Sequence, residues 1–390
     1  MIYLDYNATT PLCEPARAAM RPYLEEHFGN PSSIHAAGRE TRAAIDDARD
    51  QLAHLLGAKP HELIFTGSGT EANNLAVLGL ARAAQSRGRH LICGSTEHHA
   101  VLHAFEHLQK REGFDVTFLA VDEAGRIDPA ALAGSIRRET TLVSIMSANN
   151  ETGVIQPIDQ IAEICRARGV LLHSDMVQSF GKQPTNLHLT DAASFAAHKF
   201  YGPKGAGLLF LRAGVPLEPI QFGGAHENQR RPGTENVAAI VGMAAAASWA
   251  VSDLAEEQKR QASLRDRLRE IITSHLPEAR ENGAAAAERL ANTLNLSFPG
   301  LSSETILMAL DLEGVGASSG SACMVGSVVA SHVLRAMGAS AETAASAIRF
   351  SLGKQTTAEE IEAAGQAIVR TLARLTRTNR RRQNDSYAVV

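Results

Sequence analysis

The sequence predicts an α/β protein in which a large domain holds a mostly parallel sheet and a smaller α+β domain follows. Between residues 60 and 210, short apolar runs alternate with amphipathic segments, as strands and crossover helices do in parallel sheets. A long charged helix then begins near residue 253 and leads the chain away from this region. We therefore expect a large domain over residues 14–255 and a small domain made of residues 1–13 and 256–390.

Each element has its own local signal. A strand is expected at 3–5, and helices at 15–26 and 35–56, the second ending at Gly57. The apolar runs expected as strands of the large sheet are 62–66, 90–93, 116–121, 141–146, 170–175, 191–195 and 207–211. The helices expected around and after them are 71–84, 129–136, 158–168, 237–250 and 253–275. The C-terminal region adds strands at 295–298, 315–317 and 347–353, a helix at 303–310, and a polar tail over 377–390.

The composition is that of an ordinary globular chain, with 390 residues, 44% of them hydrophobic and 21% charged. The formal net charge of −4 argues against a nucleic-acid or membrane partner. No apolar run reaches the roughly 20 residues that a membrane span needs, and the first residues do not resemble a signal peptide. The four cysteines form no C-x-x-C pair, which favours a reducing, cytoplasmic setting.

A glycine-containing turn, Gly67-Ser68-Gly69-Thr70, joins a predicted strand to a predicted helix. A helix N-terminus offers free N–H groups and a positive dipole end, so it can bind an anion. The turn is not a Walker A loop, and it lacks the full G-x-G-x-x-G motif. Taken alone, it would most simply be an ordinary strand-turn-helix connection.

Further polar side chains follow the carboxyl ends of the predicted strands. They are His98, Asn150, Asp175, Gln178, His198 and Lys199. Because these ends meet at one edge of a parallel sheet, we expect the side chains to gather at one ligand site. Most lysines in Gly/Pro-rich turns are simply exposed, but burial would lower the pKa of Lys199 and make its amine nucleophilic. Such a lysine can form a Schiff base with pyridoxal phosphate (PLP), the electron sink of amino-acid chemistry.

Three other features bear on function. His99, His103 and His107 recur at helical spacing, but no cysteine or carboxylate cluster accompanies them, so we expect a solvated helix face and no metal site. Cys323 lies in a Ser/Gly-rich loop, which favours an accessible thiol over core packing. Arg349 interrupts an apolar strand, where a guanidinium usually binds a carboxylate in two-pronged fashion.

These motifs resemble those of the PLP-dependent cysteine desulfurases of the nitrogen-fixation and iron–sulfur type, in the class-V aminotransferase superfamily. The most specific match is Ser-Ser-Gly-Ser-Ala-Cys over residues 318–323. The other matching segments are 4–11, 28–33, 96–98, 149–153, 198–199, 202–205, 231–234 and 349–351. The resemblance implies a fold-type I PLP transferase, with a mostly parallel seven-stranded sheet in the large domain, that works as a homodimer.

The resemblance also implies a role for each cofactor-binding residue. Lys199 would bond covalently to PLP, Asp175 would contact the pyridine nitrogen, and Gln178 would contact the phenolic oxygen. His98 would stack on the ring and move protons during catalysis. The phosphate would be held by Gly69, Thr70, His198 and, from the partner subunit, Thr234.

The implied reaction removes sulfur from L-cysteine, giving L-alanine and a persulfide on Cys323 for transfer to an acceptor such as an iron–sulfur scaffold or a thiolation protein. Asn150 and Arg349 would bind the substrate carboxylate. Two alternatives stay open: a selenocysteine lyase or related PLP lyase, and a protein of this fold that has lost catalysis. Two residues differ from the family's usual pattern: Ala196, where a hydroxyl commonly binds the phosphate, and Met176, where an alanine commonly packs on the ring.

Overall fold

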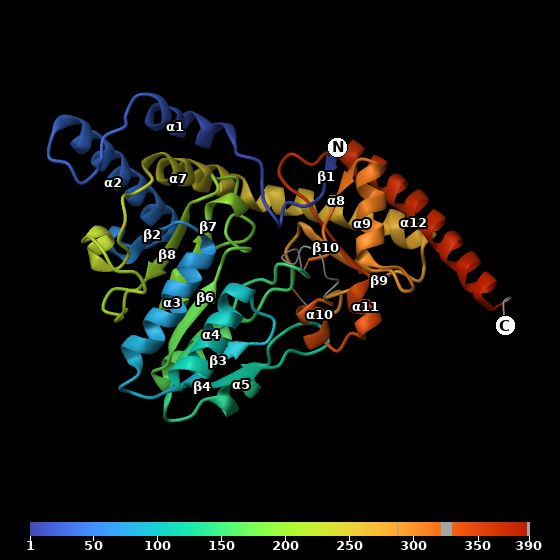
Figure 1. Ribbon diagram of the computed structural model, residues 1–390, viewed down its shortest axis with the longest axis horizontal. Coiled ribbons are helices and arrows are strands. Elements are labelled where there is room, and N and C mark those ends of the chain that lie inside the picture. Colours follow the sequence, from blue (N-terminus) through green and yellow to red (C-terminus); the bar gives the residue numbers. More distant parts are fainter. Residues whose placement is uncertain (287, 321–329, 388–390) are drawn as a thin grey trace.

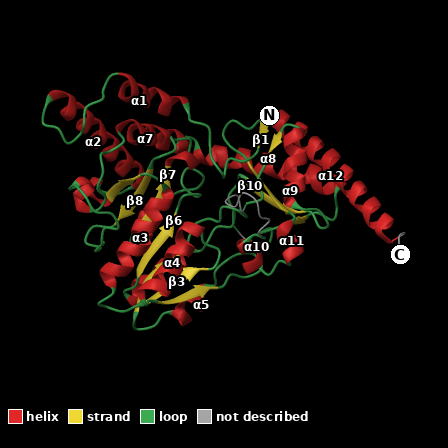
Figure 2. Cartoon of the chain, viewed as in Figure 1, coloured by secondary structure: helices red, strands yellow, loops and turns green. Residues whose placement is uncertain are grey.

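The computed structural model describes residues 1–286, 288–320 and 330–387, with side chains through Thr378. A seven-stranded sheet forms its larger part (Figures 1 and 2). In chain order its strands are β2 (Leu63–Thr66), β3 (His90–Gly94), β4 (Asp115–Leu119), β5 (Thr140–Ser144), β6 (Leu171–Asp175), β7 (Ala192–Ala196) and β8 (Gly207–Leu211). The spatial order is β2-β8-β7-β6-β5-β3-β4, and β8 runs antiparallel to both of its neighbours while the remaining pairs are parallel. The prediction of a mostly parallel seven-stranded sheet is confirmed.

Helices cover both faces of this sheet, because its strands are apolar on both sides. Leu63 and Phe65 of β2 pack toward one cluster, while Ile64 between them packs toward another. The first cluster includes residues of α1 (Glu14–Glu25), α2 (Ala36–Leu56) and α7 (Val237–Val251). The second includes residues of α3 (Gly69–Ala84) and α4 (His99–Glu112), and a third, beside it, includes residues of α5 (Pro129–Ser135) and α6 (Ile158–Arg168).

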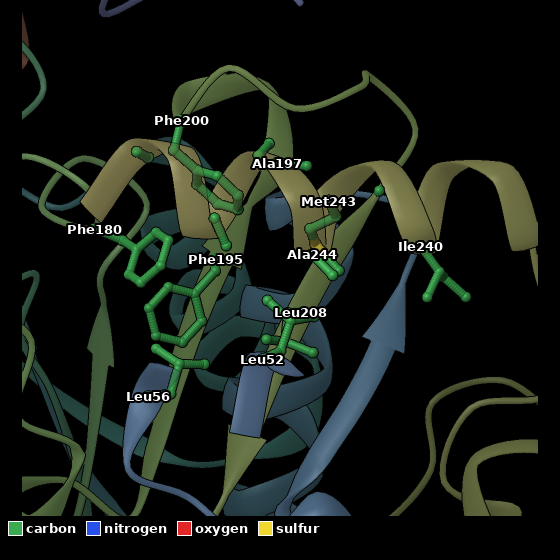
Figure 3. Packing of buried hydrophobic residues seen from close by; sticks show 14 of the residues in the cluster. Leu52, Leu56, Phe180, Phe195, Ala197, Phe200, Leu208, Ile240, Met243 and Ala244 are labelled. Carbon is green, nitrogen blue, oxygen red and sulfur yellow. The ribbon is translucent and has the colours of Figure 1, made fainter. Parts of the chain in front are cut away.

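Aromatic side chains anchor the end of β7, where the chain turns toward the candidate site. The ring of Phe180 lies edge-on to Phe195 at 5.5 Å between centroids and to Phe200 at 4.8 Å (Figure 3). All three rings are buried among residues of α2, β8 and α7. Since Phe195 and Phe200 flank the turn that carries Lys199, this packing holds both ends of that turn.

The C-terminal part of the chain forms smaller sheets of its own. A three-stranded sheet has the order β12-β10-β9, and the first strand of the chain pairs with β11 in a two-stranded sheet. The strands are β1 (Ile2–Tyr3), β9 (Arg280–Glu281), β10 (Thr293–Ser297), β11 (Val315–Gly316) and β12 (Ala347–Ser351). The helices are α8 (Leu254–His275), α9 (Ser303–Leu312), α10 (His332–Ala336), α11 (Ala341–Ala345) and α12 (Ala358–Tyr387). Short 3₁₀ turns over the whole chain are η1 (Pro60–Glu62), η2 (Leu187–Leu189), η3 (Ala197–Lys199) and η4 (His226–Gln229).

The N-terminus lies against this C-terminal part, beside α8 and α12 and away from α1 and α2 in Figure 1. Leu4 shares one buried cluster with Leu268 of α8, Phe350 of β12 and Ile368 of α12. We therefore keep as a proposal the division into a large domain (14–255) and a small domain (1–13 and 256–390). Among the described residues, no single helix is long and apolar enough to cross a membrane, and only the bent pair α7 and α8 passes that test together.

Candidate active site

A cavity of about 370 Å³ lies where the carboxyl ends of β6 and β7 meet the N-termini of α3 and α4. Nine of the residues predicted from the sequence line it: Gly69, Thr70, His98, Asn150, Asp175, Gln178, His198, Lys199 and Arg349. Thr234 does not; it lines a separate pocket with Thr66, Arg231 and Glu235. Cys323 lies outside the described residues, although Gly320, shortly before it in the chain, lines the cavity.

Lys199 ends the turn η3, directly after β7. Its Nζ donates hydrogen bonds to the backbone oxygens of Asn7 (2.8 Å) and Ala8 (2.9 Å). The turn needs a glycine at position 202, because a Cβ there would lie 2.8 Å from Ala197 Cβ and 2.9 Å from Ala197 O. The sequence thus places a lysine amine on the cavity wall by means of a tight, closely packed turn.

Asp175 is the last residue of β6, and its side chain is buried. Oδ2 accepts a hydrogen bond from Asn73 Nδ2 (2.6 Å), and Oδ1 accepts one from the backbone N–H of Val177 (2.9 Å). These two bonds fix the plane of the carboxylate at the cavity. Asn73 was not predicted from the sequence, but a buried asparagine on the apolar side of α3 is the signal that could have found it.

The N-terminus of α3 forms an anion site on the same cavity. Ser68 caps this 16-residue helix by accepting a hydrogen bond from the N–H of Glu71 (3.1 Å), while Gly69 and Thr70 begin it. A Cβ at Gly69 would lie 3.0 Å from both Ala196 Cβ and Val177 Cγ2, so the glycine keeps this corner open. An anion here would meet free N–H groups and the positive end of the helix dipole.

Two histidines flank the cavity in their neutral form. Burial, together with the charge of Lys199, lowers the pKa of His198 to about 4, and its Nδ1 lies 3.2 Å from Thr9 Oγ1. Burial also lowers the pKa of His98, against the opposing effect of Asp175. His98 caps α4, and its Nδ1 accepts a hydrogen bond from the N–H of Ala100 (3.1 Å), so the ring proton is on Nε2.

In this structure Arg349 binds a carboxylate through one nitrogen only, and not in the two-pronged fashion expected from the sequence. Its Nη2 donates to Asp5 Oδ1 (2.7 Å) and its Nη1 to the backbone oxygen of Asn150 (2.9 Å). Among the described residues its buried Nε has no hydrogen-bond acceptor. A substrate carboxylate would therefore have to compete with, or rearrange, the ion pair to Asp5.

One expectation about the ring pocket is wrong. Met176 is buried in the hydrophobic core and does not line the cavity, whereas the next residue, Val177, does. The cause is the alternation of side chains past the end of β6: Asp175 faces the cavity, and the N–H of Met176 continues the pairing to Ser194. The larger side chain of Met176 thus takes no space from a ligand.

The histidine face of α4 reaches the rim of the cavity. The ring of His99 lies 4.9 Å from that of His103 and 4.6 Å from that of His332, and both His99 and His332 line the cavity. His107 lies beside Glu112, with 3.2 Å between Nε2 and Oε1. Within the described ranges, no three His, Cys, Asp or Glu side chains are grouped so that they could hold a metal ion.

Asn7 is the most connected side chain of the site, and the sequence analysis missed it as a functional residue. Its amide bonds to residues far away in the chain: Lys182, Thr293 and Asn292 through side chains, and Asn150 through a backbone oxygen. Its backbone oxygen accepts from Lys199 and Gln178. Asn7 lies in the matching segment 4–11, but its role does not follow from the local sequence, because its partners become neighbours only in the folded chain.

The donor set fits PLP. The cofactor's aldehyde needs an amine, its ring nitrogen needs a carboxylate, and its phosphate needs an anion site; Lys199, Asp175 and the N-terminus of α3 line one cavity. The space that Gly69 leaves beside Ala196 and Val177 supports this fit, since any larger residue would fill it.

Comparisons with known proteins agree with this chemistry. A family model, aminotransferase class-V, matches residues 2–364. A cysteine desulfurase IscS of Dictyoglomus turgidum is 46% identical over 362 residues, which are 92% of this chain and 91% of that protein. Another, of Anaeromyxobacter sp., is 46% identical over 379 residues, covering 96% of this chain and 93% of that protein. A solved structure of a NifS-like protein has a TM-score of 0.89 at 37% identity, covering 95% of this chain and 99% of that one.

Proposed function

This chain belongs to the aminotransferase class-V family and is a PLP-dependent cysteine desulfurase; we propose that the cavity described above is its active site and that Cys323 receives the sulfur. The observation that carries the proposal is the convergence of an amine, a carboxylate and a helix N-terminus on this one cavity. In this assignment Lys199 binds the aldehyde of PLP, Asp175 the ring nitrogen and Gln178 the phenolic oxygen. The phosphate is held by Gly69, Thr70 and His198.

When bound, PLP supplies an electron sink that stabilises negative charge at the substrate Cα. The chain's own groups move the protons. Lys199 Nζ, when it is not bonded to the aldehyde, takes the proton from Cα, and the backbone oxygens of Asn7 and Ala8 lie within its hydrogen-bonding reach. His98 lines the cavity from the cap of α4, and its Nε2 exchanges a proton with the substrate thiol.

The substrate carboxylate is the natural ligand of Arg349, with the side chain of Asn150 beside it. To bind the substrate carboxylate, Arg349 must loosen its contact with Asp5. Because one carboxylate then replaces another beside the guanidinium, the net charge around Arg349 stays the same. The thiolate of Cys323 then forms an S–S bond with the substrate sulfur as the Cβ–S bond breaks. The electron pair of the broken bond and one proton end on Cβ, which leaves alanine.

We also propose that the enzyme is a cytoplasmic homodimer. Phe28 and Ile34, on the loop between α1 and α2, are 92% and 91% exposed, and Phe222 is 88% exposed, which supports a buried partner face there. Thr234 lies outside the cavity of its own chain, which suits a contact to the phosphate of the partner subunit. Cys13, Cys93 and Cys165 are buried free thiols, which suits a reducing compartment.

The acceptor of the sulfur is proposed to be a protein thiol of iron–sulfur or thio-cofactor assembly.

The test of the whole proposal uses purified protein, PLP and L-cysteine, with alanine and protein-bound persulfide measured together. Lys199→Ala is expected to abolish the visible absorption of bound PLP, and Cys323→Ala to keep that absorption but lose sulfide release. A colourless wild-type protein, or full turnover by the Cys323 variant, would contradict the proposal. Selenocysteine, supplied in place of cysteine, separates the desulfurase from the lyase alternative.

A further inference from the structure

Lys182 sends its side chain inward behind the active site. Lys182 lies in the turn after Phe180 and as a whole residue is partly exposed, but its amine reaches two buried acceptors. Nζ donates hydrogen bonds to Gln178 Oε1 (2.7 Å) and to Asn7 Oδ1 (3.0 Å). Lys182 does not itself line the cavity, so it contacts the site only through these two amides.

The amine of Lys182 lies buried near two other cationic side chains. Burial lowers its pKa well below the usual lysine value, and the nearby positive charges of Lys199 and Arg349 lower it further. Within the described part of the chain, no carboxylate forms a salt bridge with it. In both of its hydrogen bonds, to Gln178 and to Asn7, the amine is the donor and an amide oxygen is the acceptor.

These bonds decide which way the amide of Gln178 points. Because Lys182 can only donate through its N–H groups, the amide oxygen of Gln178 must face it. The amide nitrogen then points the other way, where it donates one hydrogen bond to Asn7 O (2.9 Å). Gln178 lines the cavity, so its second N–H is the group available to a ligand there.

The geometry points to Lys182 as a positioning residue: acting through Gln178, it keeps the amide N–H, rather than the amide oxygen, toward the phenolic oxygen of bound PLP. This inference rests on the proposed function, since it requires PLP in this cavity. With the opposite orientation, the amide oxygen would face another oxygen acceptor, and the hydrogen bond would be lost. Lys182 thus selects a hydrogen-bond direction without touching the cofactor.

The test is a double-mutant cycle with Lys182→Met, Gln178→Ala and the combination of both. The readouts are the dissociation constant of PLP and the wavelength of its visible absorption in the bound state. Lys182→Met is expected to weaken PLP binding about fivefold, the value of one ordinary hydrogen bond, and to shift the absorption band. The double variant is expected to bind PLP no more weakly than Gln178→Ala alone, because Lys182 acts only through that amide.

The matched control is Lys354→Met. Lys354 donates to the backbone oxygens of Trp249 (2.6 Å) and Ser252 (3.0 Å), away from the cavity, so its loss should lower thermal stability and leave the affinity for PLP unchanged. If Lys182→Met does not fold, Lys182→Leu, which also lacks an N–H donor, enters the same cycle. Unchanged PLP binding by the Lys182 variant, or additive losses in the double variant, would overturn the inference. A wild-type protein without the absorption band would instead contradict the proposed function.

Discussion

At the scale of single residues, buried polar side chains with fixed partners define the site. Gly69, His98, Asp175 and Lys199 could be predicted because parallel strands bring their carboxyl ends to one edge. The roles of Asn7, Asn73 and Lys182 could not be predicted, because each forms a hydrogen bond with a partner far away in the sequence. The role of Met176 was predicted wrongly, because the alternation of side chains along β6 continues past Asp175 and turns Met176 into the core.

Ala196 offers a direct test of how the phosphate is bound. Ala196→Ser adds a hydroxyl to the cavity wall beside Gly69, and a hydrogen bond to a charged group contributes about 1.5–3 kcal/mol. We expect at least tenfold tighter PLP binding, measured by titration of the apoprotein. Ala148→Ser, which adds the same hydroxyl elsewhere on the wall, is the control and should leave the affinity unchanged. Equal affinities of the wild type and Ala196→Ser would place the phosphate away from this residue.

His173 makes stability depend on pH. It lies buried between Ser144 (2.8 Å) and Ser194 (3.0 Å), and burial lowers its pKa to about 3. Because the unfolded chain takes up this proton near pH 6.5, the stabilisation is complete above that pH and is lost as pH falls toward 3. The slope approaches about 1.4 kcal/mol per pH unit.

Urea unfolding at pH 7 and pH 5 measures this effect. His173→Asn is expected to be less stable at pH 7 but to lose less stability on acidification than the wild type. His61→Asn, at an exposed position, serves as the control for removing a histidine. Parallel pH dependences of the wild type and the His173 variant would show that this ring does not titrate on unfolding.

At the scale of elements, the helices and strands of the large sheet were predicted to within a few residues. The apolar runs are short and separated by clear turn signals, so their period is unambiguous. Helix α12 was missed, because its buried face is a narrow row, Ile361, Ala364, Ile368 and Leu372, that leads into a basic segment. The row has the spacing of a helix face, and in the structure it packs against α8 and α9.

The turn η3 depends on Gly202. Gly202→Ala would push a methyl group against the backbone of Ala197, and we expect a loss of about 1–3 kcal/mol in stability together with weaker PLP binding. Gly134→Ala in α5 is the matched control, because no atom lies within 4 Å of its added Cβ and alanine favours a helix. Thermal unfolding and the visible absorption of bound PLP measure the two effects. A Gly202 variant as stable as the wild type would mean that the turn adapts without cost.

At the scale of the whole molecule, the proposed dimer can be tested through its exposed apolar residues. The double change Phe28→Asp and Ile34→Asp is expected to give a monomer in sedimentation velocity, and to weaken PLP binding because Thr234 of the partner subunit is lost. Leu312→Asp on α9 is the control, since Leu312 is 86% exposed on a different part of the surface. A dimer that survives the double change would move the interface elsewhere.

The contacts of Asn7 have a consequence for synthesis of the chain. Its N–H donates to Ser351 Oγ (2.9 Å), and its side chain forms hydrogen bonds with Asn292 and Thr293. A residue that is synthesised early therefore depends on partners that are synthesised late. A nascent chain still attached to the ribosome has Lys199 and Asp175 outside the exit tunnel long before Asn7 can take its place. The wall of the cavity around Asn7 therefore takes its final form only when both ends of the chain have come together.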